Sequence, residues 1–271
     1  MLEKHHQRSE PEEGEEDFAD HGRGTLTFAH VIDAVLFDWG DTLFRFQYDD
    51  ALLEAGWEAG LAAVGRDGLP GHGAAAERFR DRYMPLLWQP GSLEEVEYPE
   101  LVRGCLGSLE VEVDDAELER FLEAEHAAWE PARLLGDSTH ALLDVLRERG
   151  LKTGLVSNAF DPPALLHRDL AHMGLAERLD VAVFSSETGK RKPHPLIFEE
   201  ALARLGVDPS RALFVGDRRY EDVRGAKEAG MITVQAFWFR ADDDERGLEP
   251  DFEAFTTMDV LNVVRRLSGE L

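Results

Sequence analysis

Residues 35–43, V-L-F-D-W-G-D-T-L, contain an apolar run that stops abruptly at Asp38. The run begins at Val31 and predicts a buried strand, and Gly40 predicts a turn directly after it. Asp38 therefore stands where a buried strand reaches the surface. Open α/β sheets keep their reactive groups at this edge. Taken alone the pattern is weak, because aspartate is also common in turns and at helix N-caps.

The rest of the chain repeats this arrangement. Short apolar runs bounded by turn residues are typical of strands that are buried on both faces. Three of them end in small or polar residues, at Ser157-Asn158, Ser185-Ser186 and Gly216-Asp217. These three runs are residues 151–156, 181–184 and 212–215, and a final run at residues 232–237 closes the series.

Helical patterns separate the strands. T-H-A-L-L-D-V-L-R-E-R lies between an expected N-cap at Asp137-Ser138 and a C-terminal glycine at Gly150. A second pattern runs from Pro195 to Gly206, and a short one covers residues 221–230. The alternation predicts an α/β fold with a Rossmann-like, doubly wound parallel sheet whose polar residues collect at one edge.

Four motifs in this order resemble those of the haloacid dehalogenase-like (HAD) hydrolases. They are F-D-W-G-D-T-L with Asp38, V-S-N with Ser157, G-K-R-K-P-H-P with Lys192, and V-G-D-R-R-Y-E-D with Asp217 and Asp222. The resemblance extends from about residue 31 to residue 267. No single motif is specific, but all four lie at strand ends or in the loops that follow them.

The resemblance implies a phosphatase in which Asp38 attacks phosphorus and forms an aspartyl phosphate. Asp38, the main-chain carbonyl of Gly40 and Asp217 would hold Mg²⁺, with Asp222 completing the acidic set. Asp222 also has a simpler explanation, because an acidic residue in a first helical turn complements the helix dipole.

The phosphate group would be held by Ser157, Asn158 and Lys192. The Ser157 hydroxyl and the Asn158 amide are expected to bind phosphoryl oxygens, and Lys192 is expected to pair with Asp38 and the phosphate. Outside such a set, a serine after a strand is usually a helix cap, and a lysine within K-R-K is usually a solvated surface charge.

The first motif departs from the family pattern D-x-D-x-T. Gly40 occupies the position of the second aspartate, which protonates the leaving group and then activates water, and Asp41 follows one residue later. If the chain is extended here, Asp41 points away from the nucleophile, because neighbouring side chains lie on opposite faces. Asp41 is therefore a weaker candidate for the acid and base, and the alternative is that it hydrogen-bonds the loop after the strand. Loss of such a group costs about 10² to 10⁴ in rate.

Composition limits the possible partners. A formal net charge of -26 argues against nucleic acid, whose phosphates require excess lysine and arginine. The single cysteine, Cys105, favours a reducing compartment, and the sequence contains neither a membrane span nor a signal peptide. We therefore expect a cytoplasmic enzyme that acts on a small phosphorylated metabolite.

Three regions are expected. Residues 1–28 form an acidic tail with too few apolar residues to fold, residues 29–45 and 136–271 form the hydrolase core, and residues 46–135 form an inserted helical bundle. Four amphipathic helices are predicted in the insertion from apolar stripes, which the resemblance identifies as a cap over the site. Its aromatic residues favour a core role over substrate contact; they are Trp57, Tyr83, Trp88 and Trp129.

Two alternatives to the phosphatase remain open. A 2-haloacid dehalogenase uses the same aspartate without metal and lacks the second aspartate, but it does not keep an acidic pair like Asp217 and Asp222, whose repulsion favours a cation between them. A non-catalytic binding or regulatory protein would have kept the fold and lost the acid at Gly40.

Overall fold

A six-stranded parallel sheet forms the centre of the protein. The computed structural model describes residues 32–87, 92–240 and 247–269. The strand order is β5-β4-β1-β6-β7-β8, which confirms the predicted Rossmann-like fold class. The strands are β1 (Ala34–Phe37), β4 (Lys152–Ser157), β5 (Val181–Phe184), β6 (Ala212–Gly216), β7 (Ile232–Ala236) and β8 (Phe252–Ala254).

The sixth strand, β8, was not predicted. The apolar series was expected to close at residue 237, but β8 pairs in parallel with β7 beyond it. This strand is only three residues long, F-E-A, and its central glutamate is exposed. A strand that short at the edge of a sheet carries no apolar run by which a sequence pattern could identify it.

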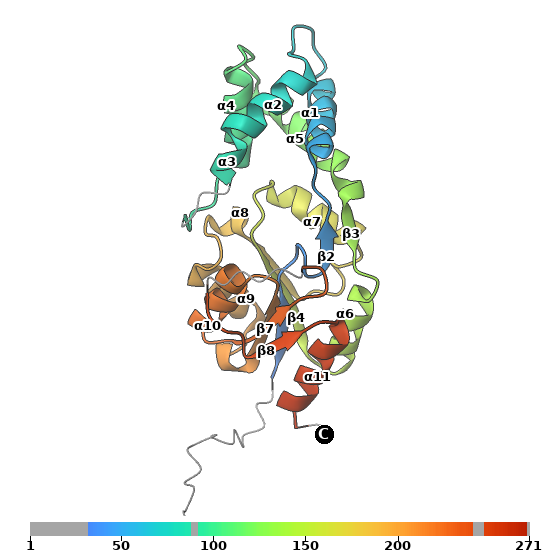
Figure 1. Cartoon of the computed structure of the whole chain (residues 1–271), viewed down its shortest axis with the longest axis vertical. Helices are drawn as coiled ribbons and strands as arrows, with labels where there is room; N and C mark the ends of the chain where they lie inside the picture. The colour runs from blue at the N-terminus through green and yellow to red at the C-terminus, as the bar shows by residue number, and fades with distance from the viewer. Residues whose placement is uncertain (1–31, 88–91, 241–246, 270–271) are drawn as a thin grey trace, which may run out of the picture.

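Helices cover both faces of the sheet (Figure 1). In β1, Val35 and Phe37 pack into one apolar cluster, whereas Ala34 and Leu36 pack into another. The first cluster includes residues of α6 (Thr139–Glu148), α7 (Pro163–His172) and α11 (Thr257–Leu267); the second includes residues of α9 (Pro195–Leu205) and α10 (Gly225–Glu228). This alternation explains why the strands appear as unbroken apolar runs in the sequence.

The predicted helix ends are largely confirmed. Gly150 and Gly206 follow α6 and α9 with φ values of 78° and 64°, a left-handed conformation that glycine adopts without strain. Ser138 is the N-cap residue of α6, as predicted, but its side chain makes no capping hydrogen bond. The short helix expected over residues 221–230 begins earlier, as a π-helix over Arg219–Arg224 that continues into α10. Two short elements complete the core: α8 (Ser185–Thr188) and the 3-10 helix Pro209–Arg211.

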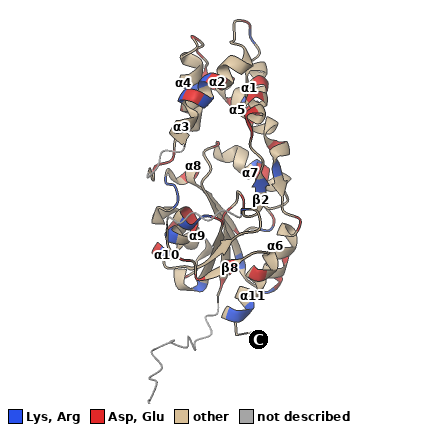
Figure 2. Cartoon of the chain, in the orientation of Figure 1, with Lys and Arg blue, Asp and Glu red and all other residues tan. Residues whose placement is uncertain are grey.

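A separate bundle of helices lies at the other end of the elongated molecule (Figure 1). It consists of α1 (Asp50–Val64), α2 (His72–Arg82), α3 (Met84–Leu87), α4 (Tyr98–Gly107) and α5 (Asp115–Ala128). We call these five elements the helical unit. It has its own apolar cluster, in which Trp57 lies 5.3 Å from Phe79 and 5.0 Å from Phe121 between ring centroids. Charges of both signs lie on α2 and α4 (Figure 2), as expected for helices that bury only one face.

Two details of the helical unit differ from the expectation. The second predicted helix is divided into α2 and α3, because Pro85 has no N–H to continue the hydrogen bonding past Tyr83. Residues 46–135 were expected to be helical throughout, but both ends belong to an antiparallel pair, β2 (Phe44–Phe46) and β3 (Arg133–Leu135). The 3-10 helix Glu130–Ala132 leads from α5 into β3. The two strands form the stem through which the chain enters and leaves the helical unit.

The acidic tail predicted at residues 1–28 and Trp88 lie outside the described residues. Within the described part of the chain, no helix combines the length and the apolar character needed to span a bilayer.

The contact between α1 and α5 generates a stability prediction. A Cβ atom on Gly60 in α1 would lie 2.6 Å from the ring of Phe121, which is fully buried and packed against Trp57. We expect Gly60→Ala to lower the free energy of unfolding by about 1–3 kcal/mol through overpacking. Gly107→Ala in α4 is the control, because its Cβ would meet open space, and it should be neutral or slightly stabilising. Urea unfolding measures both, and equal stability of the two variants would show that Phe121 can move aside.

Candidate functional site

Three predicted site residues lie at the carboxyl ends of adjacent strands. The chain passes from β1 to β4 and β5 on one side and returns to β6 on the other, so β1 and β6 flank the point where the strand order reverses. Ligand sites of doubly wound sheets lie at this point. Asp38 follows β1, Ser157 ends β4 and Asp217 follows β6, and the N–H of Asp38 donates to the carbonyl of Val215 at 2.9 Å.

Lys192 joins the candidate site from the loop before α9. Its buried ammonium group donates to Asp38 Oδ1 at 2.5 Å, to Asp222 Oδ1 at 2.6 Å and to the carbonyl of Val156 at 3.0 Å. Burial by itself would lower the pKa of Lys192, but Asp222 and Asp38 outweigh burial and raise it. Lys192 is therefore a charged, internal group and not the surface residue that a K-R-K cluster usually contains.

Asn158 positions the Lys192 main chain. The Asn158 Oδ1 atom accepts from the N–H of Lys192 at 2.7 Å, and its Nδ2 group donates to the Lys192 carbonyl at 3.3 Å. Both ends of the amide side chain are thus engaged with one residue. The loop after β4 and the loop carrying Lys192 are tied together beside Asp38.

The three aspartates form a buried acidic cluster. One carboxylate oxygen of each of Asp38, Asp217 and Asp222 lies within 4.8 Å of the others. Burial raises the pKa of Asp38 to about 6, although Lys192 opposes the shift. Burial, together with repulsion from Asp222 and Asp38, raises the pKa of Asp217 to about 8. Lys192 and the nearby arginines therefore do not fully compensate the negative charge of the cluster.

This cluster fits a hard divalent cation. Asp217 Oδ2 is buried and accepts no hydrogen bond, although the guanidinium groups of Arg240 and Arg218 lie 3.4 and 4.0 Å away. Carboxylate oxygens are the ligands that Mg²⁺ prefers, and donors on opposite sides of one ion are about 4 Å apart. The donor set, its spacing and the unsatisfied oxygen all agree with a cation site.

The chain turns sharply after Asp38, and this changes the position of Asp41. The N–H groups of Leu43 and Phe44 both point to the carbonyl of Trp39, and Asp41 has a left-handed φ of 55°. The expectation that Asp41 faces away from the nucleophile assumed an extended chain, which this turn does not provide, and Asp41 is among the residues that line the cavity with Asp38 and Gly40. Aspartate tolerates the left-handed region better than most residues.

A cavity of about 380 Å³ separates the sheet edge from the helical unit. Most of the predicted site residues line it, and Asp217 lies beside them in the acidic cluster. Trp57 and Trp129 belong to the core of the helical unit, as predicted, but Trp129 also lines the cavity. The predicted residues that line the cavity are Asp38, Gly40, Asp41, Ser157, Asn158, Lys192 and Asp222.

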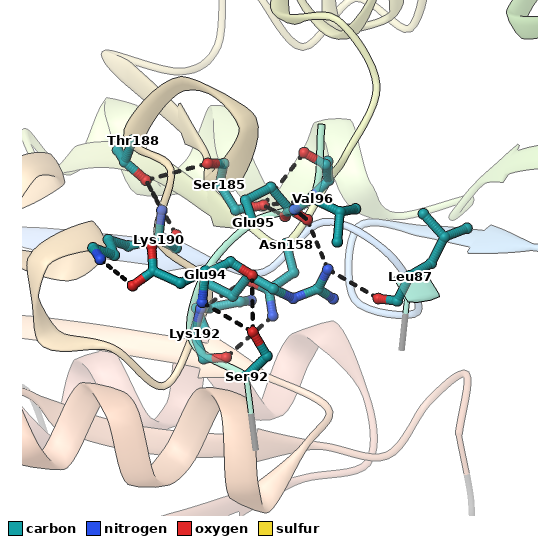
Figure 3. Close-up of polar contacts among 12 residues, drawn as sticks. Leu87, Ser92, Glu94, Glu95, Val96, Asn158, Ser185, Thr188, Lys190 and Lys192 are labelled. Atoms are coloured by element: carbon teal, nitrogen blue, oxygen red, sulfur yellow. Dashed lines mark hydrogen bonds and ion pairs between the residues drawn. The ribbon is translucent and has the colours of Figure 1, made fainter. Parts of the chain in front are cut away.

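The segment that carries Lys192 is attached to the loop between α3 and α4 (Figure 3). The Arg191 N–H donates to the carbonyl of Leu93 at 2.9 Å, and the Arg191 guanidinium donates to Glu95 Oε1 at 2.8 Å. Glu95 also accepts from the Ser185 hydroxyl, and Lys190 pairs with Glu94. The helical unit therefore contacts the core beside Lys192 as well as through the β2/β3 stem.

Several residues of the site were not singled out in the sequence. Arg191 and Arg218 lie next to motif residues, so the motifs themselves gave a signal for them. Arg240 lies beside Asp217 and comes shortly after the end of β7. Its position after a strand end is the feature of the sequence by which it could have been found. Arg133 and Phe160 line the cavity from the stem and from the loop after β4, and no local pattern marks them.

A family model for haloacid dehalogenase-like hydrolases matches residues 32–230 of the chain. Among curated relatives, glyceraldehyde 3-phosphate phosphatase of Methanopyrus kandleri is 32% identical over 89% of this chain and 100% of its own length. Phosphoserine phosphatase of Thermus thermophilus is 40% identical over 41% of each protein.

Solved structures show the same fold. A HAD phosphatase from Thermococcus onnurineus has a TM-score of 0.61 at 22% identity and covers 86% of this chain and 98% of its own. A 2-haloacid dehalogenase from Pseudomonas syringae pv. Tomato has a TM-score of 0.62 at 24% identity, with coverage of 87% and 99%. Because phosphatase and dehalogenase structures are equally similar, the fold does not separate the two chemistries.

The raised pKa values generate a prediction about pH and metal. Above pH 4 the folded protein holds protons that the unfolded chain releases, on Asp38 up to about pH 6 and on Asp217 up to about pH 8, so the stability contributed by these groups falls as pH rises through these windows. We expect Mg²⁺ to raise the melting temperature more at pH 8 than at pH 6, because the cation competes with those protons.

Thermal melts of two matched variants test this expectation. Asp217→Asn should remove most of the Mg²⁺ effect, whereas Asp137→Asn, at an exposed position, should retain it. A Mg²⁺ effect of equal size in both variants would mean that the ion binds elsewhere.

Proposed function

The chain belongs to the haloacid dehalogenase-like hydrolase family, and on that premise we propose that it is a Mg²⁺-dependent phosphatase of small phosphate esters. The relatives named as phosphatases support a phosphohydrolase. Their printed substrates, glyceraldehyde 3-phosphate and phosphoserine, support a small phosphorylated substrate. The observation that carries the proposal is the buried contact of Lys192 with Asp38 and Asp222 inside an acidic cluster.

Asp38 is the proposed nucleophile. Its pKa of about 6 leaves it mainly ionised at neutral pH, and the ammonium of Lys192 holds one of its oxygens. In-line attack on phosphorus would form an aspartyl phosphate while the ester oxygen leaves with its electron pair. Asp38, the Gly40 carbonyl, Asp217 and Asp222 would hold the cation, which when bound offsets the negative charge of the phosphoryl group.

The remaining residues would bind the phosphoryl oxygens. Ser157 contributes a hydroxyl and Lys192 contributes a charge, and the Asn158 contribution falls to its main-chain N–H, because the side-chain amide is bound to Lys192. Water then attacks the aspartyl phosphate and regenerates Asp38. Asp41 lines the cavity at the turn that follows the nucleophile and is the candidate base for that water. Whether it also protonates the leaving group is decided by the Gly40 and Asp41 variants below.

The two alternatives receive less support. A dehalogenase needs no cation, whereas the unsatisfied oxygen of Asp217 and the raised pKa values of the cluster favour one. Burying a lysine against two carboxylates costs stability. A purely regulatory protein has no need of this arrangement, whereas a phosphatase uses these groups in its reaction.

Replacing the nucleophile tests the proposal directly. We expect Asp38→Asn to lower phosphate release from acetyl phosphate by at least about 10³-fold, because an amide cannot form the intermediate. Asp137→Asn, the same change at an exposed position, should leave the rate unchanged. EDTA should abolish turnover and added Mg²⁺ should restore it. Activity that survives EDTA, or halide release from a 2-haloacid by the metal-free protein, would contradict the proposal.

The turn after Asp38 supplies a second test. A Cβ atom on Gly40 would meet nothing within 4 Å, and Gly40 is not among the glycines with positive φ, so an aspartate fits there without strain. If no acid is in place, Gly40→Asp should raise the turnover of alkyl phosphates by about 10² or more. If Asp41 already acts as the acid, Asp41→Asn should lower turnover by a similar factor, and Gly40→Asp should add little. Turnover numbers for both variants, with melting curves as the folding control, separate the two mechanisms.

A further inference from the structure

We propose that the substrate is an aryl phosphate monoester, whose ring occupies the apolar part of the cavity while its phosphate lies at Asp38 and Lys192. This inference rests on the proposed phosphatase function and adds the class of leaving group. Two independent observations carry it: the chemistry of the cavity wall opposite the aspartates, and the missing carboxylate at Gly40.

The cavity wall is chiefly aromatic and aliphatic. Its surfaces come from both parts of the molecule, so a ligand between them would be enclosed by apolar side chains on two sides. The core and stem contribute Phe44, Phe46 and Phe160. The helical unit contributes Met84 and Tyr98, together with Trp129 at the C-terminal end of α5.

Four polar aromatic residues line the cavity. The Trp39 N–H is buried and has no hydrogen-bond partner among the described residues, and the Tyr48 hydroxyl donates to Met84 Sδ at 3.7 Å. Tyr98 and Trp129 have their polar atoms engaged by stronger acceptors of the protein. The Tyr98 hydroxyl donates to Glu125 Oε2 at 2.9 Å, and the Trp129 N–H donates to the carbonyl of Leu52 at 3.2 Å. Tyr98 also packs against Phe160 with 4.8 Å between ring centroids. These side chains therefore offer ring surface to a ligand, and stacking between rings is favourable beyond the area that it buries.

The charged side chains of the wall are already paired. Beyond the acidic cluster, Asp41 and Lys192, each charged residue lining the cavity has an oppositely charged side chain or a histidine within 3.3 Å. The pairs are Arg133 with Asp169, Asp161 with His126, Arg191 with Glu95, and Arg218 with Glu221. Arg133 and Arg191 pair with buried carboxylates, and a substrate carboxylate or ammonium group that broke either pair would leave a buried charge unpaired, which is costly. The pair of Arg218 with Glu221 is partly exposed and costs less to rearrange. A neutral apolar ring requires no such rearrangement.

The departure at Gly40 favours the same class of leaving group. As the bond from Asp38 to phosphorus forms, the bond from phosphorus to the ester oxygen breaks and its electron pair leaves on that oxygen. A phenolate, whose conjugate acid has a pKa of about 10 as in tyrosine, leaves without a proton from the enzyme far more readily than an alkoxide does. It then takes its proton from water. The second step consumes one water, so the products are the phenol and inorganic phosphate.

A set of four small phosphates tests the proposal with Mg²⁺ present. Phenyl phosphate has both the ring and the good leaving group, benzyl phosphate has only the ring, acetyl phosphate has only the leaving group, and glycerol 3-phosphate has neither. We expect phenyl phosphate to have the highest kcat/KM. Benzyl phosphate should match its KM with a kcat about 10²-fold lower. Acetyl phosphate should turn over with a KM at least about 10-fold higher.

Substitutions at one short helix test the ring site. Met84 lines the cavity, whereas Leu86 in the same helix is 37% exposed and does not. Met84→Gln keeps the side-chain size and adds polarity, so it should raise the KM for phenyl phosphate about 10-fold and leave that for acetyl phosphate unchanged. Leu86→Gln, the matched control, should change neither. Melting curves confirm that both variants fold.

The outcomes separate this inference from the proposed function. If none of the four phosphates is hydrolysed, the phosphatase proposal itself fails. If acetyl phosphate is hydrolysed but glycerol 3-phosphate equals or exceeds phenyl phosphate, the phosphatase proposal stands and the aryl site is refuted. Equal kcat values for benzyl and phenyl phosphate would also refute it, because the leaving group would then have an acid supplied by the protein.

Discussion

The ammonium group of Lys192, buried between Asp38 and Asp222, is the interaction on which the rest of the site depends. Removing one partner from a buried ion pair leaves an uncompensated charge, which typically costs about 3–5 kcal/mol. The three residues therefore constrain one another. They connect the end of β1, the π-helix after β6 and the loop before α9, and Asn158 adds the loop after β4 through the Lys192 main chain. Four segments that are distant in sequence are fixed at one edge of the sheet.

The cavity divides its chemistry between the two parts of the molecule. The charged groups proposed to act on phosphorus all belong to the core, whereas the helical unit contributes mainly apolar surface. Attachment of Glu95 to Arg191 places the helical unit directly beside Lys192. In such an arrangement the helical unit can change substrate preference without altering the residues that carry out phosphoryl transfer, and exclusion of water strengthens every charge interaction beneath it.

The turn after β1 shows how one residue affects the chemistry that a fold can support. Gly40 keeps the main-chain carbonyl that the proposed cation site needs and removes a side chain that the family uses as an acid. The chain turns at once, and Asp41 is among the residues that line the cavity. The backbone conformation of this turn thus decides whether the Asp41 carboxylate can replace the one missing at Gly40. The presence of an aspartate nearby in the sequence is not enough.

The sequence by itself determined the sheet, most of its strands, the glycine-terminated helices and the four motifs, because burial on both faces leaves unbroken apolar runs and strand ends are marked by polar residues. It missed β8, which is too short to leave such a run. Its expectation for Asp41 assumed an extended chain, whereas the chain turns directly after Asp38. Only the tertiary structure decided that burial and the neighbouring Asp222 and Asp38 raise the pKa of Asp217. The same holds for the contact of Arg191 with Glu95 across 96 positions and for the hydrogen bonds that engage the polar atoms of Tyr98 and Trp129. These features arise from contacts between residues far apart in the chain, and local periodicity carries no information about which distant groups will meet.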